Sequence, residues 1–190
     1  KTCYIDTTDR QLYINHQNGR LNRFKIRYRT YLSTNSTFLE IKRKTNKGKT
    51  LKSRIQVEQY GSLSDNDISF MGSKVNLPQK PVEVAMENHF YRITLASFKT
   101  NERITIDFGL GFSNSNNQVE MPQICIVELK REKTVGKTPM QLILKNLSVY
   151  QRGFSKYCMG MALLNPGLKQ NSFKMNKLFI KKIIKNYVTN

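Results

Sequence analysis

A short stretch of the sequence, RFKIRYRTY at residues 23–31, places a basic residue at every second position. In a β-strand, alternate side chains point to the same face, so these basic side chains would lie together on one face of a sheet. Like charges directly opposed on a sheet repel each other. Guanidinium forks and lysine ammonium groups bind phosphate oxygens, so a phosphate-binding face would account for the pattern. The four residues are Arg23, Lys25, Arg27 and Arg29.

The same alternation recurs in later segments of the chain, each with polar side chains on one face and apolar side chains on the other. A sheet with one face in water also alternates, but it would carry mixed charges with Thr and Ser. Mainly basic faces favour a closed antiparallel barrel with a cationic lumen and an apolar exterior covered by helices. The further basic residues of these faces are Lys42, Lys52, Arg54, Arg92, Arg103 and Lys130, accompanied by Glu40, Asp107 and Glu128.

Composition agrees with a polyanionic partner. The 190 residues fit one domain, and 32 Lys and Arg against 13 Asp and Glu give a formal charge of +19. Nucleic acid, phosphorylated metabolites, polyphosphate or an anionic membrane would suit this charge, and a basic, solvated surface is the alternative. A nucleic-acid binder would need aromatic side chains beside the cations, whereas Phe24 and Tyr28 fall on the opposite face. Nucleic acid is therefore the least favoured partner.

Other function classes lack their residues. His16 and His89 are far apart in the sequence, which provides no histidine-based dyad or zinc cluster. The three cysteines are odd in number and show no C-x-x-C spacing, which indicates a reduced, intracellular protein. There is no long apolar run and no signal peptide, so we expect a cytoplasmic location.

The elements that must position the basic residues are mainly strands. Turn signals such as Asn18-Gly19 and the run 113–118 separate them. Residues 62–81 form a loop-rich segment that covers the barrel or carries a short helix. Thr138-Pro139 and Ser155 are helix starts for residues 140–147 and 156–164. The predicted strands are 2–9, 11–19, 23–31, 37–45, 49–57, 89–97, 102–112 and 123–132, with further turns at 46–48 and 99–101.

The last segment, residues 174–190, repeats apolar residues with helical spacing and predicts an amphipathic helix. Such a stripe usually packs on its own domain. A basic amphipathic helix can also lie on an anionic membrane, so a membrane-associated protein remains the alternative. The lysines that border the stripe are Lys174, Lys177, Lys181, Lys182 and Lys185.

Taken in order, the segments YIDTTD, RFKIRYRTY, FLEIKRKTN, KGKTLKSR, YRI, ERITIDFGLGF, IVELKRE and FSKYCMG resemble the VTC (vacuolar transporter chaperone) polyphosphate polymerase domain. That domain belongs to the triphosphate tunnel metalloenzyme (CYTH-like) superfamily, and the resemblance runs from Lys1 to about Pro166. It implies an antiparallel β-tunnel that binds a triphosphate and a divalent metal, Mn²⁺ or Mg²⁺. It also implies a polymerase that moves the γ-phosphate of ATP onto a polyphosphate chain.

The resemblance assigns roles to individual residues. It implies metal binding by Glu128 and catalytic roles for Arg27, Arg29, Lys42 and Lys156. There are two departures from the family pattern. Gly153 stands where the family has a lysine, with Arg152 one position earlier. The family's opening strand lies upstream of Lys1, so a fragment of this extent would be inactive if that strand is essential. The implied phosphate ligands are Arg27, Arg29, Lys42, Lys52, Arg92, Arg103 and Lys156.

The chemistry can be argued separately from the resemblance. Phosphoryl transfer depends on positioning and charge stabilisation, and a phosphate oxygen that attacks is already ionised, so no general base is required. Glu128 could hold a metal through hard oxygen ligands, although on residue type alone a salt bridge with Lys130 is simpler. A triphosphatase would need more inward carboxylates than Glu40, Glu128 and Asp107. A non-catalytic polyphosphate- or inositol-phosphate-binding module also remains open.

Overall fold

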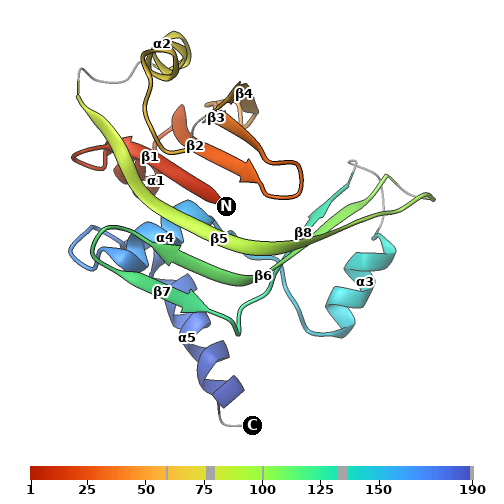
Figure 1. Ribbon diagram of the computed structural model, residues 1–190. Helices are drawn as coiled ribbons and strands as arrows, with labels where there is room; N and C mark the ends of the chain where they lie inside the picture. Colours follow the sequence, from red (N-terminus) through yellow and green to blue (C-terminus); the bar gives the residue numbers. More distant parts are fainter. Residues whose placement is uncertain (59, 76–79, 100, 132–136, 189–190) are drawn as a thin grey trace.

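The computed structural model describes residues 1–58, 60–75, 80–99, 101–131 and 137–188 (Figure 1). Strands carry most of the first two thirds of this part, and helices the last third. The strands are β1 (Thr2–Thr7), β2 (Arg23–Tyr31), β3 (Ser36–Lys44), β4 (Thr50–Val57), β5 (Val82–Ala96), β6 (Arg103–Ser113), β7 (Gln118–Met121) and β8 (Ile126–Lys130). The helices are α1 (Gln11–Gln17), α2 (Asp65–Lys74), α3 (Pro139–Asn146), α4 (Lys156–Leu164), the short 3-10 helix η1 (Asn171–Phe173) and α5 (Lys174–Val188).

The strands form one antiparallel sheet in the order β4-β3-β2-β1-β5-β6-β7, with β8 paired to β6 beside β7. The expected mainly β, α+β fold with helices packed against the sheet is confirmed. The expected closed barrel is wrong for the described residues, because β4 and β8 each have one paired neighbour and no ladder joins them. Closure requires the two edge strands of a sheet to pair with each other.

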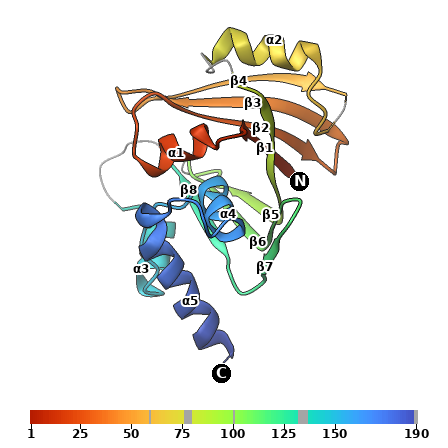
Figure 2. The same cartoon turned by 90° about the vertical axis from the view of Figure 1, so that its left-hand side faces the viewer.

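The two faces of the sheet differ as the alternation predicted. We call the face that bears Arg27, Lys42 and Arg92 the basic face, and the opposite one the outer face. On the outer face of β1–β4, Tyr28 and Leu39 are buried in a cluster with Met71 of α2. Figure 2 shows α2 above this part of the sheet. Burial of these apolar side chains stabilises the strands that carry the cations.

One end of the basic face is filled by a second apolar cluster. Helix α4 contributes Tyr157 and Met159 to this cluster, and the sheet contributes Tyr4 and Phe112. The rings of Tyr4 and Tyr157 stack with their centroids 5.0 Å apart. A Cβ atom at Gly160 would lie 2.5 Å from Phe112, so α4 can approach the sheet this closely only with glycine there. Helix α4 therefore covers this end of the basic face, and the exposed part of the face ends there.

Strand β6 serves both the charged and the apolar part of the basic face through a bulge. Its pairing with β5 shifts by one residue between His89 and Tyr91, and Gly109 has a φ of 60°, a conformation that favours glycine. Before the bulge, Asp107 faces the cations; after it, Leu110 and Phe112 are buried in the α4 cluster. The extra residue changes which side chains reach this face.

The predicted strand over 11–19 is wrong, because residues 11–17 form helix α1. The buried carboxylate of Asp6 accepts hydrogen bonds from the backbone N–H groups of Leu12 (2.8 Å) and Tyr13 (3.0 Å). The Thr7 hydroxyl accepts another from Gln11 N–H at 2.8 Å. These acceptors satisfy the free N–H groups of the first helical turn and so begin the helix.

The other predicted elements are mostly present with altered bounds. Strand β5 begins at Val82, seven residues before the predicted start, and β7 lies in a stretch for which no strand was predicted. The loop-rich segment carries α2, and Thr138 and Ser155 cap α3 and α4 as expected. Parts of the predictions fall on Thr100, on Glu132, on 76–79 and on 189–190, outside the described residues.

The expected C-terminal helix is present as α5. Ile180 is buried and, with Ile183 and Ile184, packs against the α4 cluster, whereas Lys181 and Lys182 are exposed. In the described part of the chain, no helix has both the length and the apolar character needed to cross a membrane. Contact of α5 with a membrane surface stays a prediction.

The packing of α5 generates a stability prediction. Ile180→Ala removes buried side-chain atoms and should lower the free energy of unfolding by about 2–4 kcal/mol. Leu178→Ala changes an exposed side chain of the same helix and should stay within about 0.5 kcal/mol. Urea denaturation measures both variants. Equal effects would contradict the packing of α5 on the domain.

Candidate functional site

The antiparallel register arranges the predicted basic residues in rows across β2, β3 and β4. Lys25 lies opposite Lys42, which lies opposite Lys52. In the adjoining row, Glu40 stands between Arg27 and Arg54. Opposed side chains in neighbouring strands are about 5 Å apart at Cβ, so the charges interact strongly.

The ion pair of Arg27 and Glu40 is the first of two that compensate this charge. Arg27 donates from Nε (2.7 Å) and Nη2 (2.5 Å) to Glu40 Oε2, and the two side chains are 10% and 12% exposed. Burial opposes the charged form of both groups. Even so, Tyr4 and Glu40 raise the pKa of Arg27, and Arg27 lowers the pKa of Glu40. Both residues are therefore charged at neutral pH.

Among the ion pairs of the described residues, none includes Lys42. Burial, followed by the positive charges of Arg27 and Arg29, lowers the pKa of Lys42 to about 7, although Glu40 acts in the opposite direction. A bound anion would favour the protonated amine. Lys42 is therefore a group whose charge responds to the ligand of the basic face.

Asp107 organises the second ion pair, on the other half of the sheet. It is only 1% exposed and accepts two hydrogen bonds from Arg92, at 2.6 and 2.7 Å, and one from Lys156. The pKa of Asp107 would be raised by burial, yet these bonds lower it overall. Both cations also lie over the ring of Phe90, Lys156 Nζ at 4.5 Å and the Arg92 guanidinium at 5.2 Å.

Helix α4 brings Lys156 to the basic face by its N-terminus. The Ser155 hydroxyl caps the helix by accepting from Cys158 N–H at 3.2 Å, and it also accepts from Lys25 Nζ at 2.9 Å. Two residues into the helix, the Tyr157 hydroxyl donates to Asp6, the carboxylate that begins α1. Sequence reasoning assigned no site role to Ser155 or Asp6; the N-cap position of Ser155 was the available signal.

The two ion pairs lie on the same face and are linked through the start of α4, because Lys25 of β2 donates to Ser155, the residue before Lys156. The pKa of Arg92 is raised chiefly by its hydrogen bonds to Asp107, and it also responds to Glu128 and, in the opposite direction, to Arg27. Burial lowers the pKa of Lys156, which responds to Glu128 as well. The structure therefore brings together cations from β2, β3, β5 and α4, with carboxylates from β3, β6 and β8.

The remaining predicted residues lie at the periphery of the basic face. Arg103 and Lys130 are opposite each other in β6 and β8 and are exposed, as are Lys52 and Arg54 in β4. Arg23 donates to the Arg20 carbonyl at 2.9 Å, at the start of β2. Arg29 lies over the ring of Tyr31, in the direction away from α4. These side chains surround the two ion pairs.

Glu128, the predicted metal ligand, is half-exposed and forms an ion pair with Lys130 at 3.3 Å. Within the described ranges, no three His, Cys, Asp or Glu side chains cluster in a way that could hold a metal ion. Mg²⁺ is commonly bound by one or two carboxylates together with substrate phosphates and water. A single exposed carboxylate beside a phosphate-binding face fits that mode, and it does not fit a site built from protein ligands alone.

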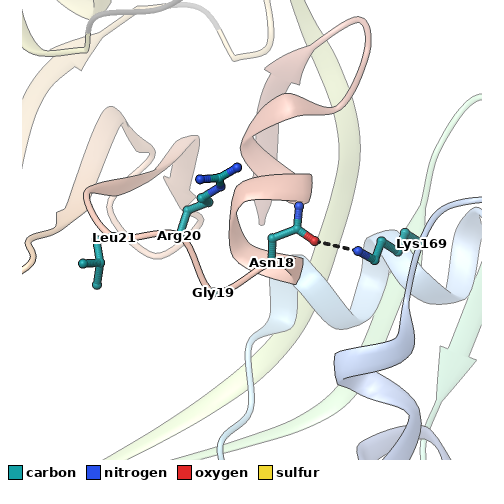
Figure 3. A pocket seen from close by; sticks show the side chains of 5 residues that line it. All are labelled: Asn18, Gly19, Arg20, Leu21 and Lys169. Carbon is teal, nitrogen blue, oxygen red and sulfur yellow. Dashed lines mark hydrogen bonds between the residues drawn. The ribbon is translucent and has the colours of Figure 1, made fainter.

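A shallow hollow elsewhere on the surface contains none of these residues. It follows α1, is lined by Asn18, Gly19, Arg20, Leu21 and Lys169, and is bridged by a 3.0 Å hydrogen bond from Lys169 to Asn18 (Figure 3). With two cations that lie apart on an open surface, it lacks the buried, compensated charges of the basic face. We therefore place the candidate site on the basic face.

Comparison with known proteins identifies the family of this chain. The VTC domain model matches residues 1–165, and the chain therefore belongs to the VTC domain family. No curated protein matches the chain. Among solved structures, it is similar to a candidate adenylate cyclase from Bacillus halodurans, with a TM-score of 0.49 and 15% identity over 83% of this chain and 79% of that one.

The lowered pKa of Lys42 predicts a pH dependence. An unfolded lysine has a pKa of about 10.4, so from about pH 7 to that value the unfolded chain holds a proton that folded Lys42 has lost. This group therefore makes folding less favourable below pH 7, and its cost declines as the pH rises. Lys42→Met should raise the melting temperature at pH 6. Between pH 6 and pH 9, the melting temperature of this variant should rise by less than that of the parent protein. The exposed Lys44→Met is the control, and identical pH profiles for all three proteins would contradict the prediction.

Asp107 supplies a second prediction for this site. Asp107→Asn keeps the shape of the side chain but leaves Arg92 and Lys156 without their buried counter-charge, so the free energy of unfolding should fall by about 3 kcal/mol. Glu120→Gln breaks a pair with His89 in which both side chains are about half-exposed, and it should cost less than about 1 kcal/mol. Chemical denaturation compares them. Equal losses would show that Asp107 does not hold the cations together.

Proposed function

We propose that the basic face binds the triphosphate of ATP and transfers its γ-phosphate to a polyphosphate chain, with Mn²⁺ or Mg²⁺ as cofactor. One observation carries this proposal: Arg27, Lys42, Arg92 and Lys156 come from four different elements and lie together on the basic face, where Arg92 and Lys156 share Asp107. Membership of the VTC domain family supports it. Such a density of cations neutralises a chain that carries about one negative charge per phosphate.

The residues of this chain would act by binding and by charge stabilisation. Arg27, Lys42 and Lys156 would hold the transferred phosphoryl group and the charge that develops around it, and Arg29 with the other peripheral cations would hold the rest of the two chains. A terminal phosphate oxygen of the acceptor forms a bond to the γ-phosphorus as the bond to the β–γ bridging oxygen breaks, and ADP leaves. The attacking oxygen is already ionised, so no proton acceptor takes part.

A metal would be held by Glu128 together with phosphate oxygens. When bound, Mn²⁺ or Mg²⁺ would supply additional neutralisation of the phosphate charge. Hydrolysis is less well supported, because Glu40 and Asp107 already bind Arg and Lys side chains and so cannot readily hold metals or orient water. A module that binds polyphosphate without catalysis has the same cations, and only an activity measurement separates the two.

The decisive experiment follows chain growth from ATP and Mn²⁺ on a polyphosphate gel. Arg27→Gln and Lys156→Gln should abolish growth, because each removes a cation from the centre of the face, and Lys47→Gln in the exposed β3–β4 turn should leave it unchanged. Tripolyphosphate at a hundredfold excess over Kd should stabilise the parent protein by about 2.7 kcal/mol, more than sodium chloride of equal ionic strength. Stabilisation without chain growth would assign a binding module, and normal growth in both Gln variants would contradict the site.

A further inference from the structure

At the end of the basic face away from α4, two aromatic side chains lie among the cations. Tyr31 is the last residue of β2, and Phe38 lies opposite Arg29 in β3. Their ring centroids are 6.1 Å apart in an edge-to-face arrangement, and Tyr31 is 39% exposed. Both rings belong to the basic face, unlike Phe24 and Tyr28, so the sequence-based statement that aromatics avoid this face is incomplete.

Two arginines of the basic face lie over these rings. The Arg54 guanidinium is 4.8 Å from the ring centroid of Phe38, and the Arg29 guanidinium is 5.8 Å from that of Tyr31. A guanidinium group stacks on an aromatic ring much as a nucleobase does, so each arginine occupies a ring face that a base could take in its place. Phosphates would also compete for both guanidinium groups, which would free the ring faces for a base. The four groups therefore combine stacking with phosphate binding.

The position of the aromatic pair matches the shape of a nucleotide. Phe38 and Lys42 are four residues apart on the same face of β3, as Tyr31 and Arg27 are in β2, which corresponds to about 13 Å at the rise of a strand. That separation leaves room for a ribose and the inner phosphates between the rings and the central cations. A surface hollow at the same end of β3 and β4 includes residues of both faces and is lined by Asn35, Thr37, Gln56, Val57 and Glu58. Of these, Gln56 lies directly opposite Phe38 on the basic face, and its amide can hydrogen-bond to the edge of a base.

We propose that Tyr31 and Phe38, flanked by Arg29 and Arg54, form a subsite that stacks the nucleobase of a nucleoside triphosphate whose phosphates lie on the basic face. This inference rests on the proposed function and adds the part of the substrate that is not phosphate. Stacking on an aromatic surface tolerates different bases. The subsite would therefore favour nucleoside triphosphates over inorganic tripolyphosphate without selecting strongly for adenine.

The outer face provides a matched control for this subsite. Tyr91 and Phe108 are also opposed aromatic residues of neighbouring strands, with ring centroids 5.7 Å apart, and both are exposed. Among the contacts of the described residues, no Arg or Lys lies over either ring. Replacement of this pair changes an exposed cross-strand aromatic contact without touching the basic face.

The test measures Kd for ATP and for tripolyphosphate by calorimetry in one buffer, for the parent chain and for the Tyr31→Leu, Phe38→Leu double variant. We expect the double variant to bind ATP about fivefold or more weakly, the loss typical of one stacked base, with tripolyphosphate binding unchanged. Tyr91→Leu should change neither value. Tyr31→Leu alone replaces the exposed residue at the strand end and provides the same comparison if the double variant does not fold.

The outcomes distinguish the nucleobase subsite from the proposed function of the basic face, on which it rests. Equal weakening of ATP and tripolyphosphate, or no change in either, would overturn the nucleobase subsite while the phosphate-binding face stands. Failure of the parent chain to bind either compound would overturn the proposed function, and the subsite with it. A selective loss of ATP affinity in the double variant alone supports the inference.

Discussion

The repulsion among the cations of the basic face is the constraint on which the rest of this structure depends. Two carboxylates, the partly buried Glu40 and the buried Asp107, stand among at least four cations of the basic face. Glu40 joins the neighbouring strands β3 and β2, whereas Asp107 joins β6 both to β5 and to α4, which lies far along the chain. Burial lowers the pKa of both Lys42 and Lys156, and the positive charges of neighbouring arginines add to this effect.

Apolar packing on both faces of the sheet stabilises the fold against this repulsion. Helix α2 covers the outer face of the strands that hold the first ion pair, and α4 closes one end of the basic face beside the second. The hydrogen bonds of Asp6 to α1 and Tyr157 connect the N-terminal strand to the helix that presents Lys156. Lys156 is therefore positioned through a buried hydrogen-bond network of Asp6, α1 and Tyr157. None of these three belongs to the two ion pairs of the basic face.

The strands and the cation-bearing face could be predicted from the sequence, because alternation with a period of two is a local property. It identified Arg27, Lys42 and Arg92 as side chains of one face. Helix α1 was missed because the short run Leu12-Tyr13-Ile14 is equally consistent with a strand, and the Asp6 carboxylate that begins the helix acts from the preceding strand. The pairing of Asp107 with Lys156 joins residues 49 positions apart and is settled only by the packing of α4. Closure of the sheet was predicted wrongly because the pattern within a strand does not specify what lies beyond an edge.

The single glycine bulge in β6 has a consequence for how this domain can change. Because Gly109 shifts the phase of the strand, residues before it and residues after it meet separate environments on the same face. Substitutions at Arg103 or Thr105 alter the charge lining without touching the packing around Leu110 and Phe112, and substitutions in the packed part leave the lining intact. Ligand preference and thermal tolerance can therefore change at separate positions of one continuous strand, with Asp107 as the position that serves both, provided that residue 109 remains a glycine.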